Sequence, residues 1–290
     1  RMYVLPNPGF PDPLSSGASL TGQPVSVTRL DPSFKMPYTI QYSIGIERQL
    51  EKGATLSVTY QGSRGIDRFR SRDINAPLPP LYLSRPDADF GVIRQIESSG
   101  RSMGESLEVS FRGRISKYFT GMAQYRLARA YDNTSGITAY PANNYDLTGE
   151  WSRSDWDRRH RFELMGAVSP GKQFNLGLAL SLYTGAPYTE TTGKDQFNDG
   201  VANDRPAGVS RNGLQGPGYA DLDLRCSRDF HLVKGKGEKS PTLTVGLDAF
   251  NTLNQVNFTS FVGNLSSPFF GLPVSAQPPR RLQLSAKIEF

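Results

Sequence analysis

The sequence lacks the long apolar run that a membrane-spanning helix needs. No segment of the 290 residues approaches ~18 consecutive apolar residues, and only 37% of the residues are hydrophobic. Neither a transmembrane helix nor a signal peptide is therefore expected. Crossing a membrane with β-strands remains open, because barrel strands alternate polar and apolar residues and need no long apolar run.

Cysteine and histidine are also scarce. Cys226 is the only cysteine, which excludes an internal disulfide framework and a metal site built from cysteines. His160 and His231 lie far apart, with no partner at metal-ligand spacing. No serine, cysteine or pair of carboxylates has a nucleophile-and-base context, so the sequence predicts neither an enzyme nor a bound cofactor.

A compact basic run is absent, although the net charge is +6. The basic residues are spread through the chain, so nucleic acid is not an expected partner. The 29 glycines and 21 prolines also disfavour a helical protein, because both residue types interrupt helices.

Two-residue alternation is present instead, and it is clearest at the carboxyl end. In the segment R-R-L-Q-L-S-A-K-I-E-F, residues 280–290, apolar and polar side chains occupy alternate positions. The apolar positions are Leu282, Leu284, Ala286, Ile288 and Phe290. This pattern predicts a β-strand with one apolar face, and its aromatic end resembles the assembly signal of bacterial outer-membrane barrels.

Eight earlier segments alternate in the same way, so the sequence predicts nine strands and an all-β fold. The expected strands cover residues 38–47, 54–61, 107–112, 119–127, 162–168, 174–182, 220–230, 243–249 and 280–290. Tight turns alternate with long loops, which are expected at 62–104, 128–158, 183–217 and 251–279. Outer-membrane barrels have short periplasmic turns and long external loops. The sequence therefore predicts part of a transmembrane, antiparallel, up-and-down β-barrel.

The expected strand length and aromatic positions agree with that architecture. About eleven residues at roughly 3.3 Å each, tilted by ~45°, span about 26 Å, close to the ~25 Å apolar band of such barrels. Phe119, Phe174, Phe230 and Phe290 lie at the short-turn ends of their strands, where an aromatic girdle is expected. The two histidines are expected in a girdle or in the lumen.

The first 36 residues have little periodicity apart from a candidate short strand at 25–29. They begin without a methionine in a segment rich in proline and glycine, which is typical of a loop. We therefore interpret residues 1–36 as the remnant of an extracellular loop and residues 37–290 as the carboxyl-terminal part of a barrel. The chain is expected to be a fragment of a longer protein.

Several motifs together resemble one family. They are Y-Q-G-S-R-G with R-S-R-D-I-N-A-P-L-P, then D-R-R-H-R-F, Y-T-G-A-P-Y, N-D-R-P-A-G-V, D-A-F-N-T-L-N-Q-V-N-F and the terminal strand. In this order they resemble the carboxyl-terminal barrel half of TonB-dependent outer-membrane receptors. The similarity is to the Oar-like group, which has a carboxypeptidase-regulatory-like front domain, and it covers residues 37–290.

The resemblance implies a 22-stranded barrel that is filled by a plug domain and takes up a scarce solute when the TonB complex pulls on the plug. This chain departs from the family pattern, because it contains no plug and no TonB box. Nine strands are also an odd number, and an open sheet cannot remain in lipid with unpaired edges. The expected partners are the plug and the remaining strands, the TonB complex, the barrel assembly machinery, outer-membrane lipid and lipopolysaccharide, and an unknown solute.

Two groups of polar residues are candidate sites. Arginines of the lumen or loops are candidate solute contacts, with pairing to lipopolysaccharide or lumen carboxylates as the alternative; they are Arg64, Arg68, Arg70, Arg158 and Arg161. An oxygen-rich loop with Asp195, Asn198, Asp199 and Asp204 is a weak candidate for Ca²⁺, but its spacing does not match an EF-hand. A loop whose side chains cap its own backbone is the favoured interpretation.

Two other functions stay open at this stage. One is an outer-membrane barrel for adhesion or secretion, which binds partners through its loops without energised transport. The other is a soluble β-rich binding module, which predicts that the apolar face from Leu176 to Leu182 is buried in a core.

Overall fold

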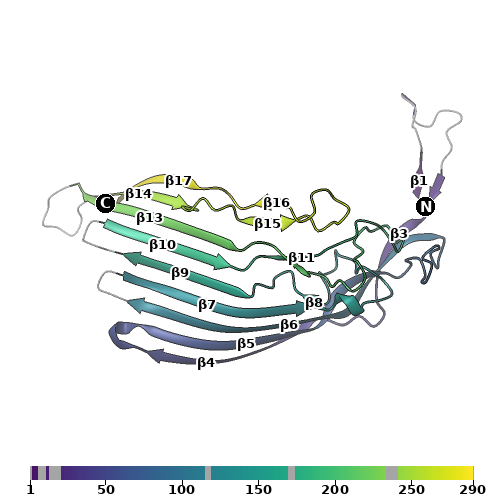
Figure 1. The fold of residues 1–290 in the computed structure, drawn as a ribbon, viewed down its shortest axis with the longest axis horizontal. Coiled ribbons are helices and arrows are strands. Elements are labelled where there is room, and N and C mark those ends of the chain that lie inside the picture. The colour runs from purple at the N-terminus through teal and green to yellow at the C-terminus, as the bar shows by residue number, and fades with distance from the viewer. Residues whose placement is uncertain are drawn as a thin grey trace.

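The computed structural model describes residues 2–5, 11–12, 21–114, 119–168, 174–232 and 241–289. Nine long strands form one antiparallel sheet in which each strand lies beside its neighbours in the sequence (Figure 1). These strands are β4 (Tyr38–Gln49), β5 (Thr55–Asp73), β6 (Phe90–Arg114), β7 (Phe119–Asp132), β9 (His160–Val168), β10 (Phe174–Tyr183), β13 (Tyr219–His231), β14 (Thr242–Phe250) and β17 (Arg281–Glu289). The predicted all-β, up-and-down sheet of nine strands is confirmed.

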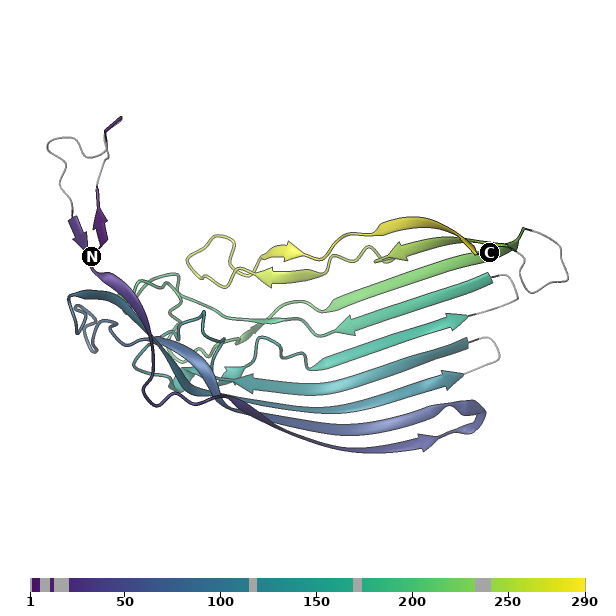
Figure 2. The ribbon, with the colours of Figure 1, turned by 180° about the vertical axis from the view of Figure 1, so that it is seen from behind.

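The sheet is open, with β4 at one edge and β17 at the other (Figures 1 and 2). The turn between β4 and β5 contains the short 3-10 helix η1 (Glu51–Gly53). The three other expected turns, near residues 115–117, 170–172 and 234–240, lie outside the described residues, and so does Phe290. No helix in the described part of the chain is long and apolar enough to cross a membrane.

The described residues bury polar side chains and expose apolar ones, which is the reverse of a soluble protein. In the described residues the buried hydrophobic side chains are three alanines, whereas 21 buried residues are polar or charged. The register places Leu178 beside Leu224 and Leu180 beside Leu222, so the leucines gather on one face. Leu176 and Leu182 on that face are 40% and 39% exposed, which contradicts the buried core that a soluble module requires.

The external ends of β5 and β6 differ from the prediction. We expected an irregular loop over residues 62–104, but the two strands continue to Asp73 and from Phe90, so the connection covers only 74–89. A register shift lies between Gly65 and Arg70, and the ladder resumes beyond it. Both faces of this extension carry polar residues, so two-residue alternation is lost although main-chain pairing persists.

Shorter elements gather at the loop end of the sheet (Figure 1). The short strand β3 (Val25–Leu30) runs parallel to β6, close to the segment expected at 25–29. The other elements are β1 (Met2–Val4) with β2 (Thr21–Gln23), the 3-10 helix η2 (Thr148–Glu150), β8 (Ser152–Arg153) on β7, β11 (Pro187–Tyr188) with β12 (Leu214–Gln215), and β15 (Phe258–Phe261) with β16 (Pro273–Ala276).

Candidate solute-binding surface

The polar face of the sheet carries a cavity of about 630 Å³. It extends across β4 to β9 and is bordered by Trp156, Arg158 and Arg161. Arg126 of β7 also lines it and lies directly across from Arg161 in the register. Three guanidinium groups from different elements therefore converge on the hollow side of the sheet, which is the lumen side of a barrel.

The arginines at this cavity are held by different partners. Arg161 donates to Glu163 Oε1 at 2.6 Å and lies over the ring of Tyr183. Arg158 donates to the main-chain oxygens of Asp155 and Asp157, both at 3.3 Å. The Nε atom of Arg126 is buried and has no hydrogen-bond partner among the described residues. The lining also holds Arg129 and the carboxylates of Glu105 and Asp157, so four arginines and two acidic groups give the cavity wall a net positive charge.

Above the cavity, the long connections 74–89, 133–159 and 184–218 pack into what we term the loop cap. Ion pairs whose carboxylates are buried hold it together: Arg85 with Asp73 at 2.7 Å, Arg153 with Asp157 at 2.8 Å, and Arg205 with Glu150 at 2.6 Å. Arg72 and Glu97 form a further pair at 2.8 Å on the neighbouring strand extensions. Removing one member of such a pair leaves an uncompensated buried charge, so these contacts hold the loops in one arrangement.

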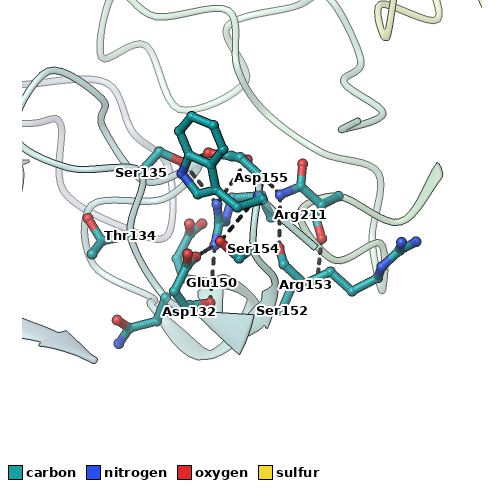
Figure 3. Close-up of polar contacts among 12 residues, drawn as sticks. Asp132, Thr134, Ser135, Glu150, Ser152, Arg153, Ser154, Asp155 and Arg211 are labelled. Carbon is teal, nitrogen blue, oxygen red and sulfur yellow. Dashed lines mark hydrogen bonds and ion pairs between the residues drawn. The ribbon is translucent and has the colours of Figure 1, made fainter. Parts of the chain in front are cut away.

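Arg211 joins two connections of the loop cap that are far apart in the sequence (Figure 3). It forms an ion pair with Asp132, which is 79 residues away, and donates to Ser135 Oγ at 2.8 Å. The hydroxyl of Ser152 donates to the main-chain oxygen of Arg211. The sequence analysis missed this contact, because nothing in the local pattern around Arg211 distinguishes it from other loop arginines.

The oxygen-rich loop around Asp199 mainly binds its own backbone. Asp195 accepts hydrogen bonds from the amides of Asp199 and Gly200 at 3.0 and 2.8 Å, and Asp204 accepts one from Gln196 at 2.5 Å. Asn198 donates instead to the main-chain oxygen of Tyr82 at 2.8 Å. Within the described residues, no group of three or more His, Cys, Asp or Glu side chains is arranged to hold a metal ion.

Burial, together with the neighbouring carboxylates of Asp195 and Asp204, raises the pKa of Asp199 to about 6. Burial also raises the pKa of Asp204, whose Oδ1 atom has no hydrogen-bond partner in the described part of the chain. Asp199 accepts a hydrogen bond from Asn144 at 2.7 Å, which ties this loop to the rest of the loop cap. The loop is therefore a proton-sensitive part of the cap.

The structure separates the five arginines predicted as solute contacts. Arg158 and Arg161 meet at the cavity on the polar face, as described above. Arg70 is buried within the loop cap, and Arg68 is exposed two residues before it. Arg64 lies across from Ile40, on the apolar face, with Nη1 3.6 Å from Met103 Sδ. The role of each arginine in solute contact stays a prediction.

Polar and aromatic residues border the apolar face at its loop end. Glu105 and Arg129 form an ion pair there at 2.5 Å. Four residues before Arg129 on β7, Tyr125 shares a hydrogen bond of 2.7 Å between its Oη and the Nδ1 of His160 on β9. His160 thus lies at a girdle, one of the two places expected for it, and the ion pair marks where the apolar band ends.

The opposite border lies at the short-turn end of the strands. Phe119 and Phe174 begin their strands, and Phe230 is the second-last residue of β13. The Arg228 guanidinium lies between two of these rings, 4.8 Å from the centre of Phe174 and 4.9 Å from that of Phe230. Leu284, Ala286 and Ile288 of the predicted assembly signal lie on the apolar face of β17, paired with Leu247, Val245 and Leu243.

The chain matches the family model of the outer membrane beta barrel domain over residues 3–210 and 207–283. It therefore belongs to this family, and its location is the bacterial outer membrane. A search of curated proteins found no match.

Three solved structures share the fold. The outer membrane transporter YddB from Escherichia coli has 12% sequence identity to this chain and a TM-score of 0.63. The similar region covers 93% of this chain and 34% of the YddB chain. The ferric-catecholate import receptor Fiu from E. coli K12 has 14% identity and a TM-score of 0.52, covering 88% and 28%. The ferripyoverdine receptor of Pseudomonas aeruginosa, bound to ferripyoverdine, has 14% identity and a TM-score of 0.54, covering 86% and 27%. The chain spans about a third or less of their lengths.

Proposed function

We propose that the chain is the carboxyl-terminal barrel segment of a TonB-dependent, Oar-like outer-membrane receptor that takes up a scarce solute. The observation that carries this proposal is the 630 Å³ cationic cavity on the polar face, below a loop cap joined by ion pairs. A barrel that served only as a scaffold has no need for converging arginines on its lumen face. The shared fold of known transporters and receptors supports the same function.

In this proposal the solute enters through the loop cap and meets Arg158 and Arg161 on its way into the lumen. Arg126, which lines the same cavity, is the next arginine on this path. Arg126 and Arg161 extend from the strands β7 and β9, which hold their side chains more rigidly than loops do, whereas Arg158 belongs to the loop cap. The remaining strands and the plug of the complete protein close the other side of the lumen.

The proposed contacts with lipopolysaccharide and with the barrel assembly machinery are inferred from exposed residues of the apolar face. Arg64 and Arg129 on the apolar face lie at the level where anionic lipopolysaccharide headgroups begin, and each is exposed. The apolar face of β17, with Leu284 and Ile288, is the surface offered to the barrel assembly machinery. The TonB complex acts through the plug and makes no contact with these residues.

The test is solute depletion by living cells. Strains that express the complete protein, with and without a functional TonB complex, are grown in the same medium, and mass spectrometry measures what each strain removes. We expect TonB-dependent loss of at least one solute, and a reduced loss in the Arg158→Gln/Arg161→Gln double variant. The Arg112→Gln/Arg114→Gln double variant, at two exposed positions at the short-turn end of β6, is the charge-matched control outside this cavity.

Two results would count against this proposal. Depletion that is the same with and without TonB excludes energised uptake. Binding of a partner to the cell surface without any depletion favours the adhesion or secretion barrel.

A further inference from the structure

A second cavity lies inside the loop cap, apart from the cavity on the polar face. Its volume is about 170 Å³. This is room for roughly five or six water molecules at ~30 Å³ each, and it is smaller than the pockets of roughly 300 Å³ or more that hold drug-sized ligands. The cavity therefore suits a group of four or five atoms.

Three arginines line this small cavity: Arg70 and Arg211, which are buried, and Arg205, which is partly buried. Arg205 is paired with Glu150. Arg211 is paired with Asp132 (Figure 3). Glu150 is the only carboxylate in the lining. The lining residues alone therefore carry an excess of positive charge.

Arg70 is the unusual member of this group. It is only 2% exposed, yet no carboxylate in the described part of the chain lies within ion-pair distance of it. Its guanidinium donates to the main-chain oxygen of Asn133 and, at 3.5 Å, to Ser99 Oγ. The closest acidic groups, Glu97 and Glu150, are already engaged by Arg72 and Arg205. A buried charge without a partner is unfavourable, and a bound anion would remove that cost.

Hydroxyl groups complete the lining. Thr134, Ser135 and Thr189 contribute side chains to the same cavity. Their hydroxyls donate to Phe69 O, Asp155 Oδ2 and Asn212 Oδ1 at 3.4, 3.2 and 3.2 Å, so each must turn away from that acceptor to donate its one proton to an oxyanion. Figure 3 shows Thr134, Ser135 and Glu150 around Arg211. Guanidinium groups bind carboxylate and phosphate oxygens with paired hydrogen bonds, which makes arginine the residue suited to this chemistry.

We propose that this cavity binds one oxyanion group, a carboxylate or a phosphate, beside Arg70. The inference does not depend on energised uptake, because it needs only the loop cap. The group comes either from a free inorganic anion that stabilises the cap or from the acidic end of a larger solute.

The experiment measures thermal unfolding of the complete protein in detergent against inorganic phosphate and acetate, with chloride keeping the ionic strength constant. We expect a saturable rise in the unfolding temperature for the parent protein. Arg70→Gln should weaken the response at least tenfold, because it removes the unpaired charge. Arg68→Gln, the same change at an exposed position two residues away, should respond like the parent.

A second variant covers the case in which Arg70→Gln does not fold. Ala139→Leu fills part of the cavity without changing a charge and should also weaken the response at least tenfold. An equal response in the parent and in either cavity variant overturns the proposal, and so does the absence of any anion effect on the parent. A phosphomonoester that binds more tightly than inorganic phosphate identifies a larger solute as the source, and weaker binding identifies the free anion.

Discussion

Gly185 lies against the main chain of Gly216, so closely that a β-carbon on Gly185 would be 1.8 Å from the Gly216 oxygen. The two glycines adjoin the paired strands β11 and β12, and the Gly216 amide donates to the Ala186 oxygen at 2.9 Å. Both partners at this contact are backbone, which cannot move aside as a side chain can. The approach of the two glycines therefore fixes how the connection 184–218 folds back over the sheet.

Replacing Gly185 by alanine should loosen the loop cap. Overpacking of this kind typically costs about 1–3 kcal/mol, and here the cost falls on the loop and not on the membrane strands. Limited proteolysis of whole cells should show faster cleavage within 184–218, with an unchanged amount of folded barrel. Gly213→Ala is the matched control, because its nearest neighbour is a Ser210 oxygen at 3.4 Å. Equal cleavage of the two variants would contradict this close contact.

The loop around Asp199 should become more stable as the pH falls. Burial raises the pKa of Asp199 to about 6, so the folded state binds a proton that the unfolded state releases. The resulting stabilisation is complete below the ordinary pKa of 3.8 and is lost as the pH rises through about 6. Hydrogen exchange of residues 195–204, corrected for intrinsic rates, should therefore be slower at about pH 5 than at about pH 7.5.

Asp199→Asn is the control for this pH dependence. It should reduce the difference between the two pH values without abolishing it, because the pKa of Asp204 is also raised by burial. If the variant keeps the full difference, the titrating group lies elsewhere.

Cys226 offers a probe of the apolar face. It is exposed, and it lies between Leu176 on β10 and Leu247 on β14. In an outer membrane its thiol should face lipid, so a membrane-impermeant maleimide should leave it unlabelled until the protein is denatured, and an apolar maleimide should label it in the native state. Mass spectrometry of the peptide that contains Cys226 measures both reactions. Rapid labelling by the impermeant reagent in intact membranes would place this face in water.

The sequence predicted the membrane part of the fold well, because alternation records which side chains face lipid. All nine long strands and the polarity of their faces follow from it, including the leucines of β10. Alternation disappears above the membrane, where both faces of a strand meet polar surroundings. For that reason the extension of β5 to Asp73 was mistaken for a loop.

The candidate site was predicted less well, because its contacts join residues that are far apart in the chain. Arg158 and Arg161 are two of the five arginines predicted as lumen or loop solute contacts, and they share a cavity. No local pattern indicates that Arg211 pairs with Asp132, or that Arg70 is buried without a carboxylate. These relationships depend on how three long connections fold onto one another.

The most direct test of the whole account compares arginine at two neighbouring positions in the middle of β10. Leu178 lies on the apolar face beside Leu224, and Ala179 lies on the polar face beside Asp223. In the complete protein, Leu178→Arg should destabilise the barrel by about 2–4 kcal/mol, as arginine does at the bilayer midplane, and should reduce the heat-modifiable folded band. Ala179→Arg should leave that band near the parent level, because Asp223 can pair with it. Equal effects at the two positions, or a larger effect at Ala179, would contradict the assignment of the leucine face to lipid.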